Sequence, residues 1–228
     1  MVRILCNDGR EVTVNIHAAS AASPTLKGVL EAPREEGAVV WIEAPSNGFE
    51  IFADWMSSGK IKYTTDKLST SVISEIRLLC EAYHTGHILD APMRLLDNVM
   101  DCIIDSVTCQ TDRGYEDLKD IITTLLRAFI GEPTGRTFIV DWLVEGNFTR
   151  CTPPDDMARE FIKVIHRDTG LWSKVSQGII CNKFLSSVDC PWDTDRCRYH
   201  QHGHSAHCYQ KQESRKRKRA SSKDSDSS

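Results

Sequence analysis

The sequence lacks any apolar run close to the roughly 20 residues that a membrane-spanning helix needs. Its first residues, MVRILCNDGREV, carry Arg3 and Asp8 and have no apolar stretch like that of a secretory signal. We therefore expect a protein that stays inside the cell and has no membrane partner. In that setting the tripeptide NFT at 147–149 does not serve as a glycosylation site.

Recognisable catalytic motifs are also missing: there is no glycine-rich phosphate loop, no HExxH and no nucleophile elbow. His17 stands at a strand-to-helix junction, where a partly buried structural histidine is more common than a catalytic base. His84 and His87 lie three residues apart on a predicted helix without an evident third metal ligand. Asp155 and Asp156 follow TPP and are typical of a helix N-terminus. We expect no catalytic residue and no enzyme; a thiol-dependent enzyme is the least favoured alternative.

The nine cysteines are an odd number, which does not suit a fully paired disulfide framework. In a reducing compartment they are most simply free thiols, several of them buried like small hydrophobic residues. Cys80 and Cys102 fall within apolar helical patterns, as this interpretation requires.

Length and charge indicate a folded body followed by a distinct tail. A chain of 228 residues with 40% hydrophobic and 26% charged residues suits one globular domain with an extension. Residues 209–228 contain seven lysines and arginines against three acidic residues, a net charge of +4, so residues 1–208 carry −8. Because phosphate binding needs a positive face, nucleic acid is not the expected partner of the folded body.

The first sixty residues predict a small sheet interrupted by helices. VRILC and EVTVNI alternate on either side of NDG, which predicts a β-hairpin. Pro24 divides the next helical stretch, so one helix ends near Ser23 and another begins at the proline. AVVWIEA at 38–44 is a continuous apolar run, which indicates a strand buried on both faces. KIKY at 60–63 predicts a further brief strand.

Helical spacing dominates the remaining body. Phe49, Phe52 and Met56 form one stripe that Gly59 ends. Longer stripes run from Leu68 to Tyr83, from Leu96 to Val107 and from Leu118 to Phe129, with Asp90 as the N-cap of the second and Pro92 in its first turn. FIVDWLVEG at 138–146 is ambiguous between strand and helix, and MAREFIKVI at 157–165 predicts a last amphipathic segment.

This order of elements predicts an α+β fold, with a small mixed sheet capped by a cluster of helices. We divide the chain into a domain at 1–108, a helical extension at 109–189, a Cys/His-rich segment at 190–208 and a disordered tail at 209–228. The tail is basic first and then rich in serine and aspartate.

The motifs of residues 1–108 resemble the BTB/POZ domain family, especially its compact intracellular versions in filamentous fungi. The resemblance rests on NIHAAS, SPTLKGVL, FEIFADWMSSGKI and LLCEAYHTGHILDAPMRLLDNVMDCII, taken in this order and spacing. The positions that match the family's motifs are His17, Ser23, Phe49, Phe52, Trp55 and Gly59.

The resemblance implies an interaction module that self-associates or docks onto other proteins, including cullin scaffolds of ubiquitin ligases and transcriptional co-regulators. In the family's strand-swapped dimers an extra helix and strand precede the core. This chain starts on the first core strand, so that swapped contact is not expected. WMSSG also replaces the family's WLYTG, and no cullin-contact motif matches residue by residue.

Seven residues in the Cys/His-rich segment are candidate metal ligands: Cys190, Cys197, His200, His202, His204, His207 and Cys208. Zinc prefers four N or S ligands, often as close pairs, and Cys197 with His200 has such a spacing. His204 or His207 with Cys208 offers a second pair. The linker between the pairs is short and few hydrophobic residues accompany them. A flexible tail that binds metal weakly is therefore the favoured alternative, and no cofactor is expected.

The tail contains five consecutive cations: Arg215, Lys216, Arg217, Lys218 and Arg219. Such a run suits the acidic groove of an import receptor and predicts a nuclear protein that is also found in the cytoplasm. A plain solubilising run is the alternative.

Together these features predict a non-enzymatic adaptor or scaffold that binds other proteins. The alternative is a nucleic-acid-associated factor in which the Cys/His-rich segment folds on zinc and the basic run binds phosphates. Zinc content and a steep salt dependence of DNA binding would favour that alternative.

Overall fold

The chain starts with the predicted hairpin. In the computed structural model, which describes residues 1–33, 38–61, 72–108, 115–147, 163, 166, 169–182 and 190–201, β1 (Val2–Leu5) pairs antiparallel with β2 (Glu11–Val14). Gly9 supports the turn because its φ of 82° favours a residue without a side chain. β3 (Val40–Trp41) pairs parallel with the other side of β1, so the strand order is β2-β1-β3. The sheet is therefore mixed, as predicted.

The third strand differs from its prediction. Val40 is 6% exposed and Ile42 is 5% exposed, but Trp41 between them is 59% exposed. The strand lies at an edge of the sheet and buries one face only, so the expectation of burial on both faces is wrong. The residue types are all apolar, and for that reason the sequence did not reveal the alternation.

Ser23 joins the first two helices, α1 (Ile16–Ala22) and α2 (Pro24–Glu31). Its backbone N–H donates to Ala19 at the end of α1, and its hydroxyl accepts from the N–H of Leu26 at 2.9 Å. The same hydroxyl donates to the carbonyl of Leu89. The first N–H groups of a helix have no partner within the helix, and the buried Ser23 side chain provides one for α2. The same side chain also connects the start of α2 with the segment that contains Leu89.

Helix α3 (Ser46–Ser58) connects the sheet with the helices. Phe49 and Phe52 are fully buried, and Gly59 ends the helix as predicted, with a φ of 66° and its N–H 2.7 Å from the carbonyl of Trp55. Gly48 permits α3 to approach α4, because a Cβ at this position would lie 2.5 Å from the carbonyl oxygen of Glu81.

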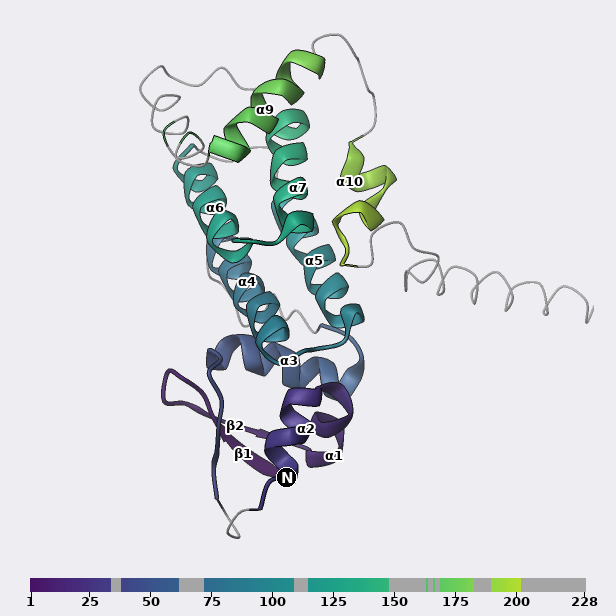
Figure 1. Ribbon diagram of the computed structural model, residues 1–228. Helices are drawn as coiled ribbons and strands as arrows, with labels where there is room; N and C mark the ends of the chain where they lie inside the picture. Colours follow the sequence, from purple (N-terminus) through teal and green to yellow (C-terminus); the bar gives the residue numbers. More distant parts are fainter. Residues whose placement is uncertain are drawn as a thin grey trace, which may run out of the picture.

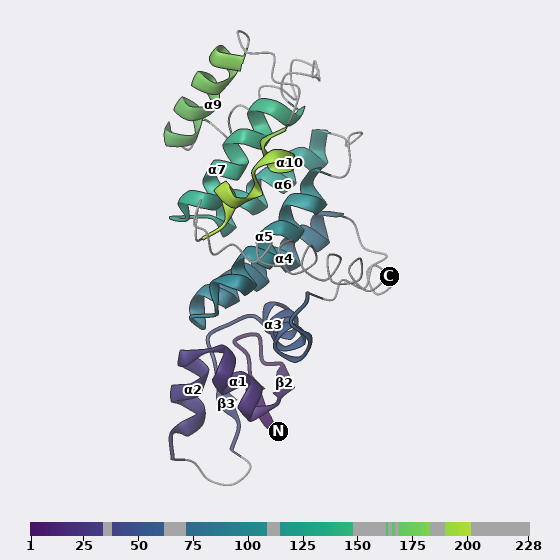
Figure 2. The same ribbon diagram turned by 90° about the vertical axis from the view of Figure 1, so that its right-hand side faces the viewer.

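A stack of helices extends from α3 away from the sheet (Figures 1 and 2). Its members are α4 (Val72–Ile88), α5 (Met93–Thr108), α6 (Tyr115–Ala128), α7 (Pro133–Asp141), the π-helical η1 (Trp142–Asn147) and α9 (Thr169–Asn182). The predicted apolar stripes from Ile76 to Tyr83, Leu96 to Val107 and Leu118 to Phe129 are buried in one core. The segment 138–146, which was ambiguous from the sequence, is helical.

Asp90 does not have its predicted role. It follows α4 with a φ of 48°, and α5 begins at Met93, directly after Pro92. Aspartate tolerates this left-handed conformation, which terminates α4 instead of capping α5. Its carboxylate accepts a hydrogen bond from the Thr25 hydroxyl at 2.8 Å.

The fold is thus α+β, with nine α-helices and a three-stranded mixed sheet in the described ranges. Within those ranges, no helix combines the length and hydropathy needed to cross a membrane. The predicted strand at 60–63 beyond Ile61, the residue Leu68 and the segment 157–165 apart from Lys163 lie outside the described residues. So do Asp155 and Asp156.

Candidate protein-interaction surface

The residues 190–201, called the C-terminal arm below, lie against the helical stack (Figures 1 and 2). The arm contains the short helix α10 (Pro191–Thr194) and the 3-10 helix η2 (Arg196–Tyr199), and η2 contacts α5 and α7. Trp192 is 6% exposed, and Tyr199 and His200 are fully buried. This part of the Cys/His-rich segment therefore packs onto the core of the helices.

Acidic residues of α5 form hydrogen bonds and ion pairs with the C-terminal arm. His200 Nε2 lies 3.0 Å from Asp101 Oδ1, and Arg196 Nη2 lies 2.6 Å from Asp105 Oδ1. The backbone N–H of Gln201 donates to Asp97 at 2.9 Å. Asp97, Asp101 and Asp105 are spaced by four residues, so they share one face of α5. That acidic face matches the arm's cationic side chains.

Asp141 at the end of α7 provides a second attachment. The Tyr199 hydroxyl donates to Asp141 Oδ2 at 2.8 Å, and Arg198 Nη2 lies 3.1 Å from the same oxygen. Burial, and then the charge of Asp141, raise the pKa of Tyr199 far above its usual value, so the phenol remains a donor. The ring of Tyr199 packs edge-on against Phe138 at 5.4 Å.

Three of the candidate metal ligands belong to the arm: Cys190, Cys197 and His200. His200 forms a hydrogen bond with Asp101, and Cys197 is a buried cysteine outside any disulfide. In the ranges that the structure covers, no three His, Cys, Asp or Glu side chains gather as a metal site would require. The other candidates, His202, His204, His207 and Cys208, lie outside the described residues, as do the five cations at 215–219.

The positions that match the BTB/POZ motifs have different environments. Ser23, Phe49 and Phe52 are buried, Trp55 is half-buried and stacks on Phe52 at 6.4 Å, and Gly59 ends α3. His17 is exposed, so the expected partly buried histidine is wrong at this position. The reason is that Asn15 caps α1 and Ile16 turns inward, which leaves His17 on the solvent face.

Three cysteine thiols in the described part of the chain have raised pKa values. Burial, followed by nearby carboxylates, raises the pKa of Cys6 to about 11, and burial followed by Glu81 raises that of Cys80 to about 12. The pKa of Cys102 also rises to about 12, again mainly through burial. The thiolate is the nucleophilic form, so these three side chains remain protonated at neutral pH. None of the five cysteines in the described ranges forms a disulfide, as predicted for them.

The most exposed aromatic surface lies at the edge strand β3. Trp41 is 59% exposed and Val39 is 36% exposed, and Trp41 is the one aromatic among the strongly exposed apolar residues of the described ranges. The N–H of Ile42 donates inward to Leu5 at 3.0 Å. Because backbone groups alternate in direction along a strand, those of Trp41 point to the outer side. We call Val39, Trp41 and this outer backbone the sheet-edge surface.

Comparison with known proteins does not identify a relative: no family model, curated protein or solved structure matches the chain significantly.

Proposed function

We propose that this protein is a BTB/POZ-like interaction module, an adaptor or scaffold that binds other proteins and catalyses no reaction. The order of its elements supports the resemblance noted in the sequence. A hairpin is followed by a helix break at Ser23, the edge strand β3, and helix α3 ending at Gly59. The motifs on which the resemblance rests follow the same order.

The observation that carries this proposal is the exposure of Trp41 on β3, which is an edge strand of the sheet in the described ranges. An exposed edge strand offers unpaired backbone groups to a further strand. A partner segment that adds to β3 would gain backbone hydrogen bonds and cover the indole, and tryptophan is enriched among the residues that dominate binding energy. The sheet-edge surface therefore suits an extended segment of another protein.

The proposed partners are a cullin scaffold or transcriptional co-regulators, and self-association is a further use of the same module. An import receptor would bind the five cations at 215–219 and bring the protein into the nucleus. In this proposal, the folded body selects partners and the basic run determines location.

Affinity purification with mass spectrometry tests the proposal when it compares four full or nearly full chains. These are the wild type, Trp41→Ser, Ile130→Ser and a chain ending at Gln201. Ile130 is 75% exposed and provides a matched apolar control away from the sheet. The chain that ends at Gln201 keeps the C-terminal arm and its contacts, whereas a chain that ends before residue 190 would lack the arm.

We expect Trp41→Ser to reduce partner recovery, with affinity falling roughly thirtyfold as for an interface hot spot. The Ile130→Ser chain and the chain ending at Gln201 should retain the same partners, while the latter loses nuclear enrichment. If the partners instead disappear with residues 202–228, and chromatin proteins or nucleic acid disappear with them, the proposal is wrong and the zinc-dependent alternative is favoured.

A further inference from the structure

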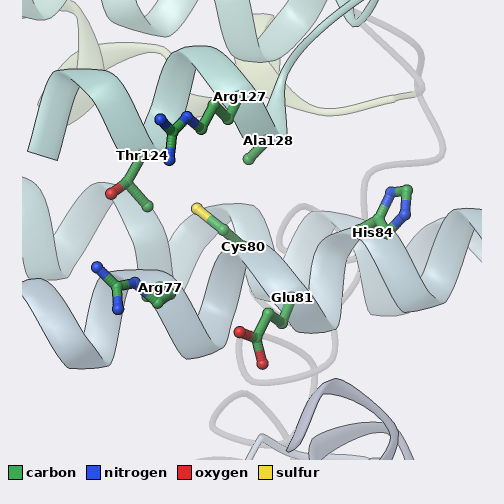
Figure 3. A pocket seen from close by; sticks show the side chains of 7 residues that line it. All are labelled: Arg77, Cys80, Glu81, His84, Thr124, Arg127 and Ala128. Carbon is green, nitrogen blue, oxygen red and sulfur yellow. The ribbon is translucent and has the colours of Figure 1, made fainter. Parts of the chain in front are cut away.

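A groove of about 480 Å³ lies between α4 and α6, and none of its lining residues belongs to β3 (Figure 3). Its lining comes from two helices: α4 contributes Arg77, Cys80, Glu81 and His84, and α6 contributes Thr124, Arg127 and Ala128. Cys80 is 7% exposed and points from α4 toward α6, so it forms the floor. Arg77, His84 and Arg127 are exposed at the rim.

The two arginines of this groove differ from the other described arginines. Arg3, Arg196 and Arg198 have carboxylate partners, and Arg10 donates to Asn47. Arg94 and Arg136 also have interactions. Among the arginines of the described ranges, only Arg77 and Arg127 form no hydrogen bond or ion pair. Both line the same groove, from opposite helices.

Among the described lining residues, Glu81 alone carries a carboxylate, and no ion pair joins it to Arg77 or Arg127. Glu81 accepts a hydrogen bond from Asn47 of α3 at 3.3 Å, and in Figure 3 its carboxylate points away from the helix that carries Arg127. The groove thus presents two guanidinium groups and the Thr124 hydroxyl around an apolar floor. This positive site stands out on a body whose residues 1–208 carry a net charge of −8.

We infer that the α4–α6 groove binds an acidic segment of a partner protein, in which at least two carboxylates pair with Arg77 and Arg127. Guanidinium groups bind carboxylates through two parallel N–H···O bonds, which a lysine rim would not provide. The apolar floor and the position of the groove between two helices suit a peptide with alternating acidic and apolar side chains better than a small inorganic anion. The inference rests on the proposed function as an interaction module but uses a second face, independent of Trp41.

Fluorescence anisotropy with a defined probe tests this inference. The probe is a fluorescein-labelled twelve-residue peptide with alternating glutamate and leucine or alanine, and its control has glutamine at every glutamate. All chains are full length, and Arg215, Lys216, Arg217, Lys218 and Arg219 are each replaced by Gln, because this run would bind any acidic peptide. In that background we compare the unaltered body, Arg77→Gln with Arg127→Gln, and Arg3→Gln with Lys27→Gln.

We expect the acidic probe to bind the unaltered body at low salt, and the glutamine control to bind at least tenfold more weakly. The Arg77→Gln, Arg127→Gln chain should lose about tenfold or more in affinity. The Arg3→Gln, Lys27→Gln chain has the same change in net charge at β1 and α2, whose side chains do not line the groove, and should stay within about twofold. Trp41→Ser should bind the probe normally, which separates this site from the proposed sheet-edge surface.

A charge exchange provides a second test that does not depend on loss of binding. Arg77→Glu with Arg127→Glu should reject the acidic probe and bind a probe with lysine at every glutamate position. Equal losses in the groove variant and in the Arg3→Gln, Lys27→Gln control would show general electrostatic attraction and overturn the inference. Failure of the acidic probe to bind the unaltered body, or failure of the exchanged pair to bind the lysine probe, would also overturn it.

Discussion

The docked C-terminal arm leads to a quantitative prediction at Tyr199. The side chain is fully buried, packs against Phe138, and donates to Asp141 at 2.8 Å. Tyr199→Phe removes only the hydroxyl. Asp141 keeps Arg198 at 3.1 Å, so we expect the low end of the range for a hydrogen bond to a charged group, about 1.5 kcal/mol of unfolding free energy. Tyr199→Ala also removes the ring, and aromatic deletions from a core cost about 3–5 kcal/mol.

Urea unfolding followed by tryptophan fluorescence measures these losses, and Trp192 within the arm contributes to the signal. Met93→Ala, at a position that is 61% exposed, provides a control expected within about 0.5 kcal/mol of the wild type. If the arm separates before the rest unfolds, the loss for Tyr199→Ala cannot exceed the free energy of docking. Tryptic cleavage after Arg196 or Arg198 under native conditions then reports the separation directly, and it should accelerate in the order wild type, Phe variant, Ala variant.

The reasoning would be refuted by an Ala variant that unfolds within about 0.5 kcal/mol of the wild type and is cleaved no faster. That outcome would mean that residues 190–201 do not hold the observed contacts in solution.

Three further predictions concern packing, pH and metal. Gly48→Ala places a methyl group 2.5 Å from the Glu81 carbonyl oxygen and should destabilise the fold by about 1–3 kcal/mol. A Cβ at Gly28 would meet nothing within 4 Å, so Gly28→Ala should be neutral or stabilising. Thermal unfolding measures both effects. Burial raises the pKa of Cys80 and Tyr83 to about 12. The free energy of unfolding should therefore have its full value below about pH 9 and fall as the pH rises toward 12. The urea midpoint should show this fall, and the fall should be smaller in Cys80→Ala. His200 is already held by Asp101, so EDTA should leave the urea midpoint and the tryptic cleavage of the arm unchanged, and a lower midpoint would indicate a structural metal.

Short sequence patterns predicted the helices and strands that depend on residues close together in the chain. Alternation predicted the hairpin, Pro24 located a helix break, and the spacing from Leu118 to Phe129 predicted α6. The exposure of Trp41 was missed because three consecutive apolar residues look alike whether one or both faces of a strand are buried. That distinction depends on the position of β3 at an edge, which a single stretch of sequence does not contain.

The docking of the arm was missed for a different reason. Few apolar residues follow Cys190, and the segment was read as a polar tail with metal ligands. A signal was nevertheless present: Asp97, Asp101 and Asp105 recur every four residues on α5, and Arg196 and His200 in the arm are also four residues apart. The two patterns match each other, but they are about a hundred residues apart, and local spacing alone does not indicate which segments meet.

The length of chain between these partners also affects how the protein is made. Tyr199 and Gln201 pair with residues that lie 58 and 118 positions earlier. At about 5–20 residues per second, the ribosome needs roughly 5–20 seconds to proceed from Asp101 to the end of the arm. Within that interval α5 and α7 are completed, and until the arm follows, their aspartates and apolar faces that contact it stay uncovered. The nascent helical stack is therefore most exposed to aggregation and chaperone binding just before its last described segment is made.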